Sequence, residues 1–443
     1  MVGKIDKNPQ MDIFRTPLKH FINKNHELCL LADEIDWESI EKEFNEYYSK
    51  IGRPGIPIRK MVGLVILKYL KNLSDERVVE AWQENPYWQY FTGEAYFQIG
   101  QPMEPTDFVN FRKRIGEKGC ELILRISIQL FGDEAIEDEV QVDTTVQEKD
   151  ITFPTDTKLH KKIIEKCWKI SEKEKVKLRQ SYKRVVKQLM LEQRNRNHPK
   201  RKKKAVAAAK KIKTIAGRLV RDLERKLPEE LNCFYENTFK LYHEILLQER
   251  TSKNKIYSLH EPHVKCIAKG KEAKQYEFGN KSSIAKTRNS GIIVGAMAFT
   301  ENLYDGDTLE PQLEQINRLT GKTPKTATVD RGYRGRKTVG DTKIELPKPP
   351  KRDATRYQKT KARKRFRARA SIEPVIGHVK HDHRMIRNYL SGIEGDKTNT
   401  ILAAAAFNFN KMLNRLKSKA KKYFFDLLEQ IFKQFFDLFF SYS

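Results

Sequence analysis

Cysteine is scarce in this chain, and the few cysteines present are badly placed for a covalent or metal framework. There are five in 443 residues, and no two of them form a CxxC pair. Neither a disulfide-stabilised secreted domain nor a zinc ribbon is expected from such spacing. A reducing cytoplasm is the compartment that fits.

Long apolar segments are also missing. The first ten residues, MVGKIDKNPQ, hold no apolar core of the kind that a secretory signal needs, and no uninterrupted apolar stretch is long enough to span a bilayer. We therefore expect a cytoplasmic protein with no membrane partner.

Acidic residues are too few to balance the basic ones. Lys and Arg number 86 against 58 Asp and Glu, a formal net charge of +28. Such an excess attracts polyanions, so nucleic acid is the first partner to consider. A basic surface kept for solubility, for a ribosome or for a membrane surface is the alternative. The length of 443 residues indicates two or three structural units.

The first part of the chain, residues 1–135, has the apolar spacing of helices. Pro57 and Ser74 are suitable helix starts, and the tight turn around Asn72 between them permits a helix-turn-helix. We expect a helical domain that binds DNA or serves assembly.

A strand pattern begins at residues 139–146, EVQVDTTV, which contain Asp143. Residues 156–250 then return to helical spacing around the run RNRNHPKRKKK, which predicts an inserted helical hairpin with a basic tip. The tip could contact DNA, be a solvated charge run, or mediate dimerisation.

Strands resume after the insertion. We expect them at residues 255–260, 263–268, 275–278, 292–299 and 325–329, with a helix over 307–319. The fold class is therefore α+β with several domains. The final segment, 416–443, predicts an amphipathic helix that packs on protein or, alternatively, lies on a membrane surface.

Three carboxylates stand where they could hold metal ions. Asp143 lies within the first strand, Asp330 ends a later strand, and Glu373 lies in a helix. Phosphodiester chemistry uses two metal ions ~3.5–4 Å apart, and Mg²⁺ prefers carboxylates from rigid elements together with water. A lone Asp at a strand end is usually a turn former, so the set of three carries the hypothesis.

The sequence around Glu373 reads RFRARASIEPVIGHVKHDH. Pro374 is tolerated only in a first turn, so Ser371 is the expected cap and Glu373 lies near the positive end of the helix dipole. Lys380, two turns later, falls on the same face as Glu373 and could reach a phosphate.

These residues resemble those of a known family. The order Asp143, Asp330, Glu373 and the segment VDRGYRG are similar to the DDE transposases of bacterial insertion-sequence families four and five, and most to family five. Their signature is Tyr, Arg, Glu, Lys at spacings of two, three and six. Arg369, Glu373 and Lys380 match it, whereas Phe366 stands at the tyrosine position and lacks the hydroxyl.

The resemblance implies a fold and a site. It implies a helical domain over residues 1–135 and an RNase H-like mixed α/β catalytic domain over 136–415, with the helical insertion at 156–250. It also implies that Asp143, Asp330 and Glu373 are catalytic and bind Mg²⁺ as two ions, for which Mn²⁺ can substitute. Arg369, Lys380 and Phe366 are then expected at transposon-end DNA.

Other residues are weaker candidates for DNA contact. Arg331, Tyr333 and Arg334 directly follow the second carboxylate and could grip the backbone, although a basic turn is the alternative. Lys281 lies among the strands and is a further candidate. His378, His381 and His383 are interpreted as a basic helix face, because no cysteine lies near them.

The leading hypothesis is a transposase that binds the terminal inverted repeats of an insertion sequence, assembles as a homo-oligomer on DNA, and cuts and joins DNA ends to target DNA. It would act in the cytoplasm, at the nucleoid when bound to double-stranded DNA. A metal-dependent nuclease without strand transfer and a non-catalytic DNA-binding protein, such as a decayed transposase, are the alternatives.

Overall fold

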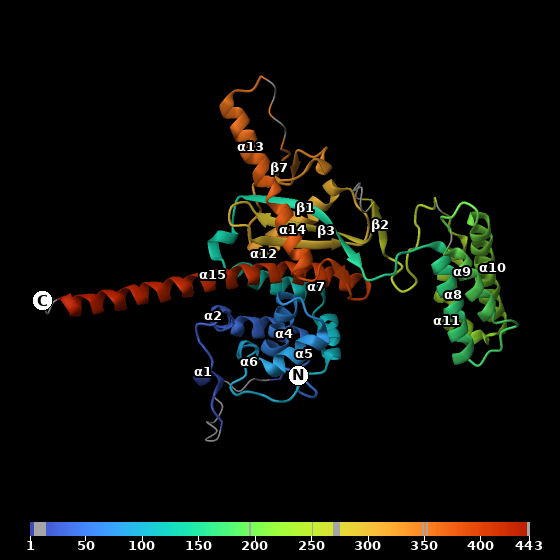
Figure 1. Ribbon diagram of the computed structural model, residues 1–443, viewed down its shortest axis with the longest axis horizontal. Helices are drawn as coiled ribbons and strands as arrows, with labels where there is room; N and C mark the ends of the chain where they lie inside the picture. The colour runs from blue at the N-terminus through green and yellow to red at the C-terminus, as the bar shows by residue number, and fades with distance from the viewer. Residues whose placement is uncertain are drawn as a thin grey trace. The chain divides into compact units, whose positions relative to one another are not determined.

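The computed structural model divides the chain into two compact units (Figure 1). It describes residues 1–3, 15–194, 196–249, 251–268, 275–347, 350 and 353–440, with side chains up to residue 419. Unit 1 comprises Met1–Glu148 and Lys281–Ser443, and unit 2 comprises Lys149–Asn280.

The amino-terminal part of unit 1 is helical, as the apolar spacing predicts. Pro57 stands at the start of α4, and the Ser74 hydroxyl accepts a hydrogen bond from the Arg77 amide at the start of α5. The helices are α1 (Leu18–Phe21), α2 (Glu27–Glu34), α3 (Trp37–Phe44), α4 (Ile58–Leu70), α5 (Asp75–Glu84), α6 (Pro86–Phe91) and α7 (Pro105–Gln129).

The sheet of unit 1 is mixed. Its strands run in the order β3–β1–β5–β7–β6, with β4 paired to β3 and β8 to β1. The pairs β1–β5 and β5–β7 are parallel, whereas β3–β4 and β6–β7 are antiparallel. The strands are β1 (Glu139–Lys149), β3 (Tyr276–Thr287), β4 (Ile293–Phe299), β5 (Thr326–Thr328), β6 (Thr338–Val339), β7 (Thr342–Glu345) and β8 (Arg387–Asn388). The α+β class is therefore confirmed.

Four further helices complete unit 1. They are α12 (Leu309–Thr320), α13 (Arg356–Ala370), α14 (Ile372–His381) and α15 (Gly392–Phe440). Helix α13 occupies a segment for which the sequence predicted only a polar, basic character. The Thr355 hydroxyl and the Gln358 side chain close a reciprocal capping box at its first turn, which satisfies two backbone amides locally.

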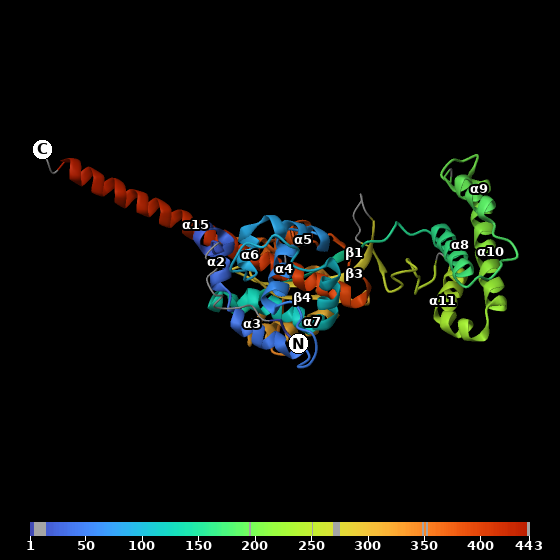
Figure 2. The ribbon, with the colours of Figure 1, turned by 90° about the horizontal axis from the view of Figure 1, so that it is seen from below.

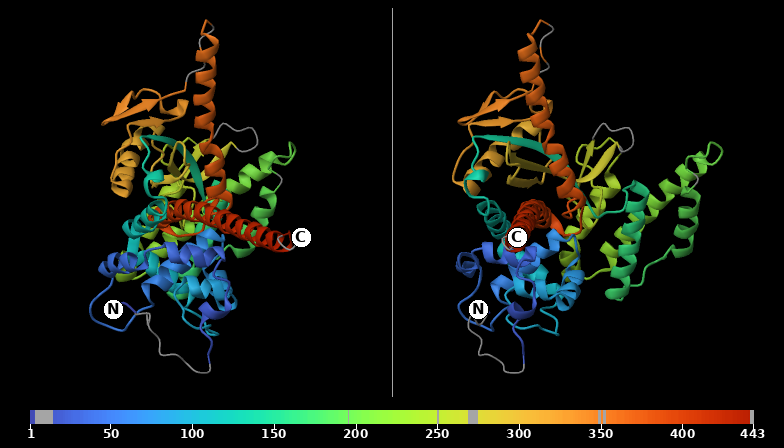
Figure 3. Two further views of the ribbon diagram at one scale, coloured as in Figure 1. Left: turned by 90° about the vertical axis from the view of Figure 1, so that its left-hand side faces the viewer. Right: turned by 60° about the vertical axis from the view of Figure 1, so that its left-hand side comes forward.

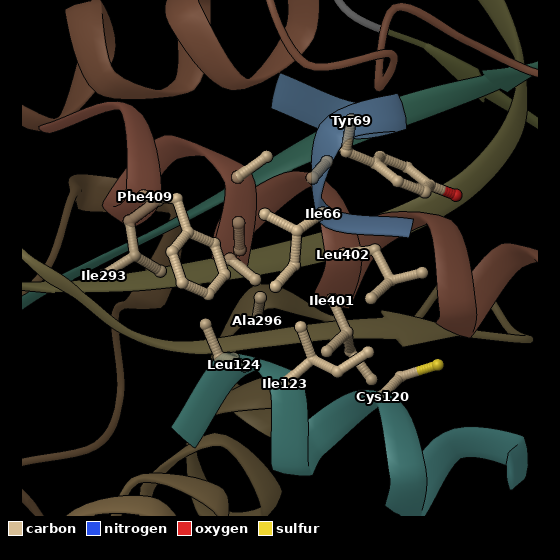
Figure 4. Packing of buried hydrophobic residues seen from close by; sticks show 14 of the residues in the cluster. Ile66, Tyr69, Cys120, Ile123, Leu124, Ile293, Ala296, Ile401, Leu402 and Phe409 are labelled. Atoms are coloured by element: carbon tan, nitrogen blue, oxygen red, sulfur yellow. The ribbon is translucent and has the colours of Figure 1, made fainter. Parts of the chain in front are cut away.

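One hydrophobic core joins the amino-terminal helices to the sheet (Figure 4). Ile66 of α4, Ile123 of α7, Ile293 of β4 and Phe409 of α15 all belong to it. Helix α4 is buried on almost every side, as expected for a helix that is apolar all round. The expected domain boundary at residue 135 therefore does not separate two compact units. The buried residues of α4 share one core with the sheet, so the amino-terminal helices and the sheet belong to the same unit.

The carboxyl-terminal boundary expected at residue 416 falls inside α15, whose backbone runs without a break from Gly392 to Phe440 (Figure 2). The prediction of an apolar face on the tail concerns side chains beyond residue 419, which lie outside the described residues. In the part of the chain that was searched, no helix has the length and apolarity needed to cross a membrane.

Unit 2 contains four helices where the sequence predicted a two-helix hairpin. They are α8 (Asp156–Lys173), α9 (Lys183–Gln193), α10 (Lys202–Lys226) and α11 (Glu229–Leu247). The first predicted helix is split because Lys175 and Tyr182 adopt positive φ angles of 53° and 57°, and Pro228 separates α10 from α11. The four helices enclose a core of their own.

The strand predictions at the end of unit 2 are partly wrong. Residues 255–260 form no strand, because the Gln248 side chain binds both the amide and the carbonyl of Ile256, at 3.0 and 3.2 Å. The strand predicted at 263–268 is shortened to β2 (Lys265–Ala268), which pairs antiparallel with Tyr276–Gly279 of β3.

Candidate active site at the strand ends

Asp143 and Asp330 lie at matching positions of two neighbouring parallel strands, Asp143 within β1 and Asp330 two residues beyond the end of β5. Strands β1 and β5 pair with Gln141 opposite Thr328, and each aspartate follows two residues later in its own strand direction. Neighbouring strands are about 4.8 Å apart, so this register brings the two backbones side by side at the aspartates. Both side chains are partly exposed there.

Glu373 reaches the same place through Arg369. The Arg369 Nη2 atom lies 3.3 Å from Glu373 Oε1 and 3.8 Å from Asp143 Oδ2. Glu373 is in the first turn of α14, and Ser371 is at its N-cap position, as the sequence predicts. One guanidinium therefore lies between two of the three predicted carboxylates.

Gln141 fixes the junction of α13 and α14 to β1, a role that the sequence did not indicate. Its Oε1 accepts a hydrogen bond from the Ser371 hydroxyl at 2.9 Å, and its Nε2 donates to the Ala368 carbonyl at 2.5 Å. The Ser371 hydroxyl thus donates to Gln141 of β1 and does not cap α14. Gln141 is two residues before Asp143, so this contact holds the start of α14, and with it Glu373, close to Asp143 along β1.

Asp305 is a fourth carboxylate at the site, and sequence reasoning missed it. Its Oδ1 accepts hydrogen bonds from the Thr144 hydroxyl at 2.8 Å and from Lys281 Nζ at 2.9 Å. The Asp305 and Asp330 carboxylates flank Gly332, where a Cβ atom would lie 2.8 and 2.9 Å from their oxygens. The segment DGDT at residues 305–308 is typical of a helix start, so nothing in the sequence indicated that Asp305 belongs to the site.

The residues after Asp330 divide into buried and exposed ones. Tyr333 is fully buried, and burial, followed by the charges of Asp143 and Asp305, raises its pKa well above the usual value. Its ring therefore packs beneath the site, and the expectation that Tyr333 contacts DNA needs correction. Arg331 and Arg334 are exposed, so the basic part of the prediction rests on them.

The remaining candidates surround this cluster. Lys281 donates to Asp305 and to the Leu303 carbonyl, and only 12% of its side chain is exposed, so a phosphate contact would require it to leave both partners. Phe366 is 41% exposed on α13, and Lys380 is partly exposed on α14.

Helix α13 extends away from the sheet of unit 1 (Figure 3). It is strongly basic and has no buried residue. Eight of its fifteen residues are Lys or Arg and none is acidic. Arg365 and Lys361 line a pocket between this helix and the end of β7, together with Arg288. The helix therefore brings a concentrated positive charge directly to Glu373.

The carboxylates suit a hard divalent cation in their chemistry. All are oxygen donors, which is what Mg²⁺ prefers, and a guanidinium cation already lies between Asp143 and Glu373. Across the described ranges, no three His, Cys, Asp or Glu side chains are gathered closely enough to hold an ion. Metal binding at this site thus requires Arg369 to move aside.

The three histidines after Glu373 do not add ligands. His378 Nδ1 pairs with Asp382 at 2.7 Å, whereas His383 is buried with its Nδ1 3.1 Å from the Tyr69 carbonyl. His381 is exposed. The interpretation as a basic helix face fits His378 and His381 on α14 but not His383, which is buried beyond the end of that helix.

The predicted helix-turn-helix has the expected turn between two helices, but its second helix is acidic, which is unfavourable for binding DNA. Asn72 turns the chain between α4 and α5 with a φ of 55°. Helix α5, DERVVEAWQE, has four acidic residues and one arginine, and Asp75 pairs inward with Lys68 and Arg112. An acidic second helix repels DNA phosphates, so assembly is the better interpretation of this part.

Comparisons with known proteins identify transposase domains in this chain. The family model described as "Transposase domain (DUF772)" matches residues 16–114, and the one described as "Transposase DDE domain" matches 250–409. The second range includes Asp330 and Glu373, whereas Asp143 lies outside both. The chain is 40% identical to "Uncharacterized protein ORF8 in nfe locus" of Rhizobium meliloti over 193 residues, 42% of this chain and 93% of that protein. No solved structure matches.

Proposed function

The chain belongs to the DDE transposases, and we propose that it binds the terminal inverted repeats of an insertion sequence and catalyses metal-dependent DNA cleavage and strand transfer. The element is proposed to be of family five, with which the two matched domains are compatible. The observation that supports the activity is the placement of Asp143 and Asp330 at matching positions of the paired strands β1 and β5, with Arg369 lying between Asp143 and Glu373.

The sheet supports an RNase H-like arrangement of the catalytic domain. An antiparallel pair, β3–β4, lies beside the parallel pair β1–β5 in the sheet, and Asp143 lies within β1 while Asp330 follows the end of β5. Ligands and substrates gather at the carboxyl ends of parallel strands, where loops rather than hydrogen-bonded ladder surround them.

Asp143, Asp330 and Glu373 would hold the divalent cations, two Mg²⁺ or Mn²⁺ ions, which activate the attacking oxygen and stabilise the leaving oxygen when bound. Gln141 keeps Glu373 level with the aspartates. Arg369 balances Asp143 and Glu373 until the substrate arrives and then pairs with a phosphate, which a guanidinium can bind through two parallel hydrogen bonds.

The DNA path follows the basic elements around these carboxylates. Helix α13 lies against the backbone of the element end, with Phe366 offering a ring for stacking. Arg331, Arg334 and Lys380 contact phosphates on the other sides of the strand ends. Two ends are paired in a homo-oligomer, and the protein acts in the cytoplasm at the nucleoid.

Two alternatives use the same residues differently. A nuclease of related architecture would cut without joining, and a decayed transposase would bind DNA without cutting. The presence of all three carboxylates in the sequence argues against decay, because an inactive protein has no need to keep them.

The decisive experiment is Mg²⁺-dependent cleavage and joining of a labelled element end, with native protein and the isosteric variants Asp143→Asn, Asp330→Asn and Glu373→Gln. We expect joined products from native protein and at least a ~1000-fold loss in each variant, since electrostatic stabilisation supplies several kcal/mol of the barrier. DNA affinity should be unchanged or higher. Glu314→Gln, on the exposed side of α12, is the matched control.

Cleaved ends without joined products would identify a nuclease. Variants that cut and join as fast as the native protein would show that the catalytic carboxylates have been misassigned.

A further inference from the structure

Half of the chain's excess positive charge is concentrated in one part of unit 2. Residues 183–226, which comprise α9, the connecting loop and α10, contain 17 Lys and Arg against 3 Asp and Glu. Helix α11 of the same unit has the opposite balance, with four Glu and one Lys. Helix α8 is intermediate, with six Lys against three acidic residues, so the net positive charge of the unit is densest in the α9–α10 part.

The basic residues of α10 form a regular row on a rigid support. Ile212, Leu219 and Leu223 face the core of unit 2, so the helix is held by packing. On its exposed side, Lys204, Lys211, Arg218 and Arg225 follow one another at intervals of seven residues. Seven residues are nearly two helical turns, or about 10.5 Å, so these four cations lie along one stripe.

Few acidic groups neutralise this stripe. Lys204 pairs with Glu192 at 3.3 Å and Arg225 with Asp222 at 3.5 Å, and both basic side chains remain at least 70% exposed. Lys211 and Arg218 have no acidic partner among the residues that the structure describes. Exposed pairs of this kind are weak and screened, so they leave most of the field in place.

A groove lined by residues of α9 and α10 continues the row. Arg184 of α9 stands on one side, Lys204 and Lys211 of α10 stand on the other, and Ala207 and Ala208 form the floor. Small floor residues let a strand approach closely while cations on both sides reach its phosphates. This combination distinguishes the groove from a charge run spread over a solvated helix.

We propose that the α9–α10 face of unit 2 is a second DNA-binding surface, one that holds the phosphate backbone of double-stranded DNA without reading its sequence. A dense row of cations on a polyanion releases bound counterions, which is the main driving force for such binding. The alternative partner is the acidic α11 of a second copy, but four glutamates cannot balance seventeen cations. This inference does not depend on the catalytic role of the three carboxylates.

The experiment measures the affinity of the full chain for a fluorescent 20-base-pair duplex of scrambled sequence over a range of salt concentrations. The test variant combines Lys204→Gln, Lys211→Gln and Arg218→Gln. The control variant removes the same charge from the α8–α11 side of the unit through Lys166→Gln, Lys169→Gln and Lys240→Gln. A third variant, Lys204→Arg, Lys211→Arg and Arg218→Lys, keeps the charge.

If each stripe residue meets a phosphate, the slope of log affinity against log salt should fall by about 3 in the test variant, and affinity at moderate salt should fall at least about tenfold. The control and charge-keeping variants should retain the native slope within about 1. Circular dichroism and unfolding curves confirm that all three fold.

Equal slopes in the test and control variants would overturn the proposal. It would also be overturned if the test variant kept its affinity for the duplex and lost self-association in sedimentation without DNA, because the face would then bind another copy. Since the duplex has no element end, neither result depends on cleavage or on end recognition.

Discussion

At the scale of single residues, Gly332 has an unusually tight position. It lies between the Asp305 and Asp330 carboxylates, and its own amide donates to Asp330 Oδ1 at 2.7 Å. Its backbone is ordinary, with no positive φ. The reason for a glycine here is therefore space beside two carboxylates rather than backbone freedom.

Gly332→Ala should move a carboxylate without unfolding the protein. The added methyl group would lie 2.8 Å from Asp305 Oδ2 and 2.9 Å from Asp330 Oδ1, so at least one must turn away. Because a displacement near 1 Å can reduce a rate by about 100-fold, cleavage of the element end should fall by that order. Gly377→Ala in α14, where an added Cβ meets nothing within 4 Å, is the control. Equal cleavage by both variants would mean that Asp330 does not need its present position.

At the scale of elements, buried charges connect α4, α5 and α7. Asp75 begins α5, and its carboxylate forms ion pairs with Lys68 Nζ of α4 at 2.5 Å and with Arg112 Nη2 of α7 at 2.8 Å. Burial lowers the pKa of Lys68 to about 8, which reflects the cost of holding a cation there. The turn between α4 and α5, which resembles a DNA-binding motif, is thus held against unit 1 by the ion pairs of Asp75.

Asp75→Ala should destabilise unit 1 strongly. It leaves Lys68 and Arg112, which are only 3% and 9% exposed, without their common partner. Removing one member of a buried ion pair costs about 3–5 kcal/mol, which urea unfolding should measure. Arg77→Ala breaks the exposed Arg77–Glu80 pair in the same helix and should cost less than about 1 kcal/mol. Similar losses in the two variants would contradict this account.

Helix α13 illustrates a different balance at the same scale. It buries no residue, and its eight cations repel one another, so packing within unit 1 does not explain why it is there. A nearby polyanion would relieve that repulsion. The position of this helix immediately before Glu373 is consistent with the proposed DNA path.

At the scale of the whole molecule, the chain has two cores and should not unfold as one. The sheet and amino-terminal helices share the first core, and the four helices of unit 2 enclose the second. Stability changes in one unit can thus be separated from those in the other. Trp168 is the one tryptophan within the limits of unit 2 and reports on it.

Acid should destabilise unit 2 through His160. Burial lowers the pKa of this side chain to about 4, below the 6.5 of the unfolded chain. Between these values the unfolded chain binds a proton that the folded unit excludes, so the free energy of unfolding falls as the pH falls from about 6.5 to about 4. The full effect is about 3 kcal/mol.

The measurement is urea unfolding followed by Trp168 fluorescence at pH 7 and pH 4, for native protein and His160→Gln. The variant lacks the titrating group, so the native protein should lose more stability than the variant. Equal losses would show that His160 is not the cause.

The sequence by itself determined the helical start of the chain, the strands that carry Asp143 and Asp330, the first-turn position of Glu373 and the basic insertion. Each of these is local: a spacing of apolar residues, a proline that only a first turn accepts, a run of lysines. The resemblance to DDE transposases, which rests on the same short segments, is confirmed for the same reason.

Only the tertiary structure decided which residues meet. Asp305 joins the site because the turn after β4 brings its carboxylate beside Gly332, and Gln141 contacts the start of the helix that carries Glu373 across more than two hundred residues of chain. Tyr333 is buried and α4 is part of a shared core because packing partners come from distant segments. Such contacts depend on the three-dimensional register of strands and helices, which no local pattern of residues contains.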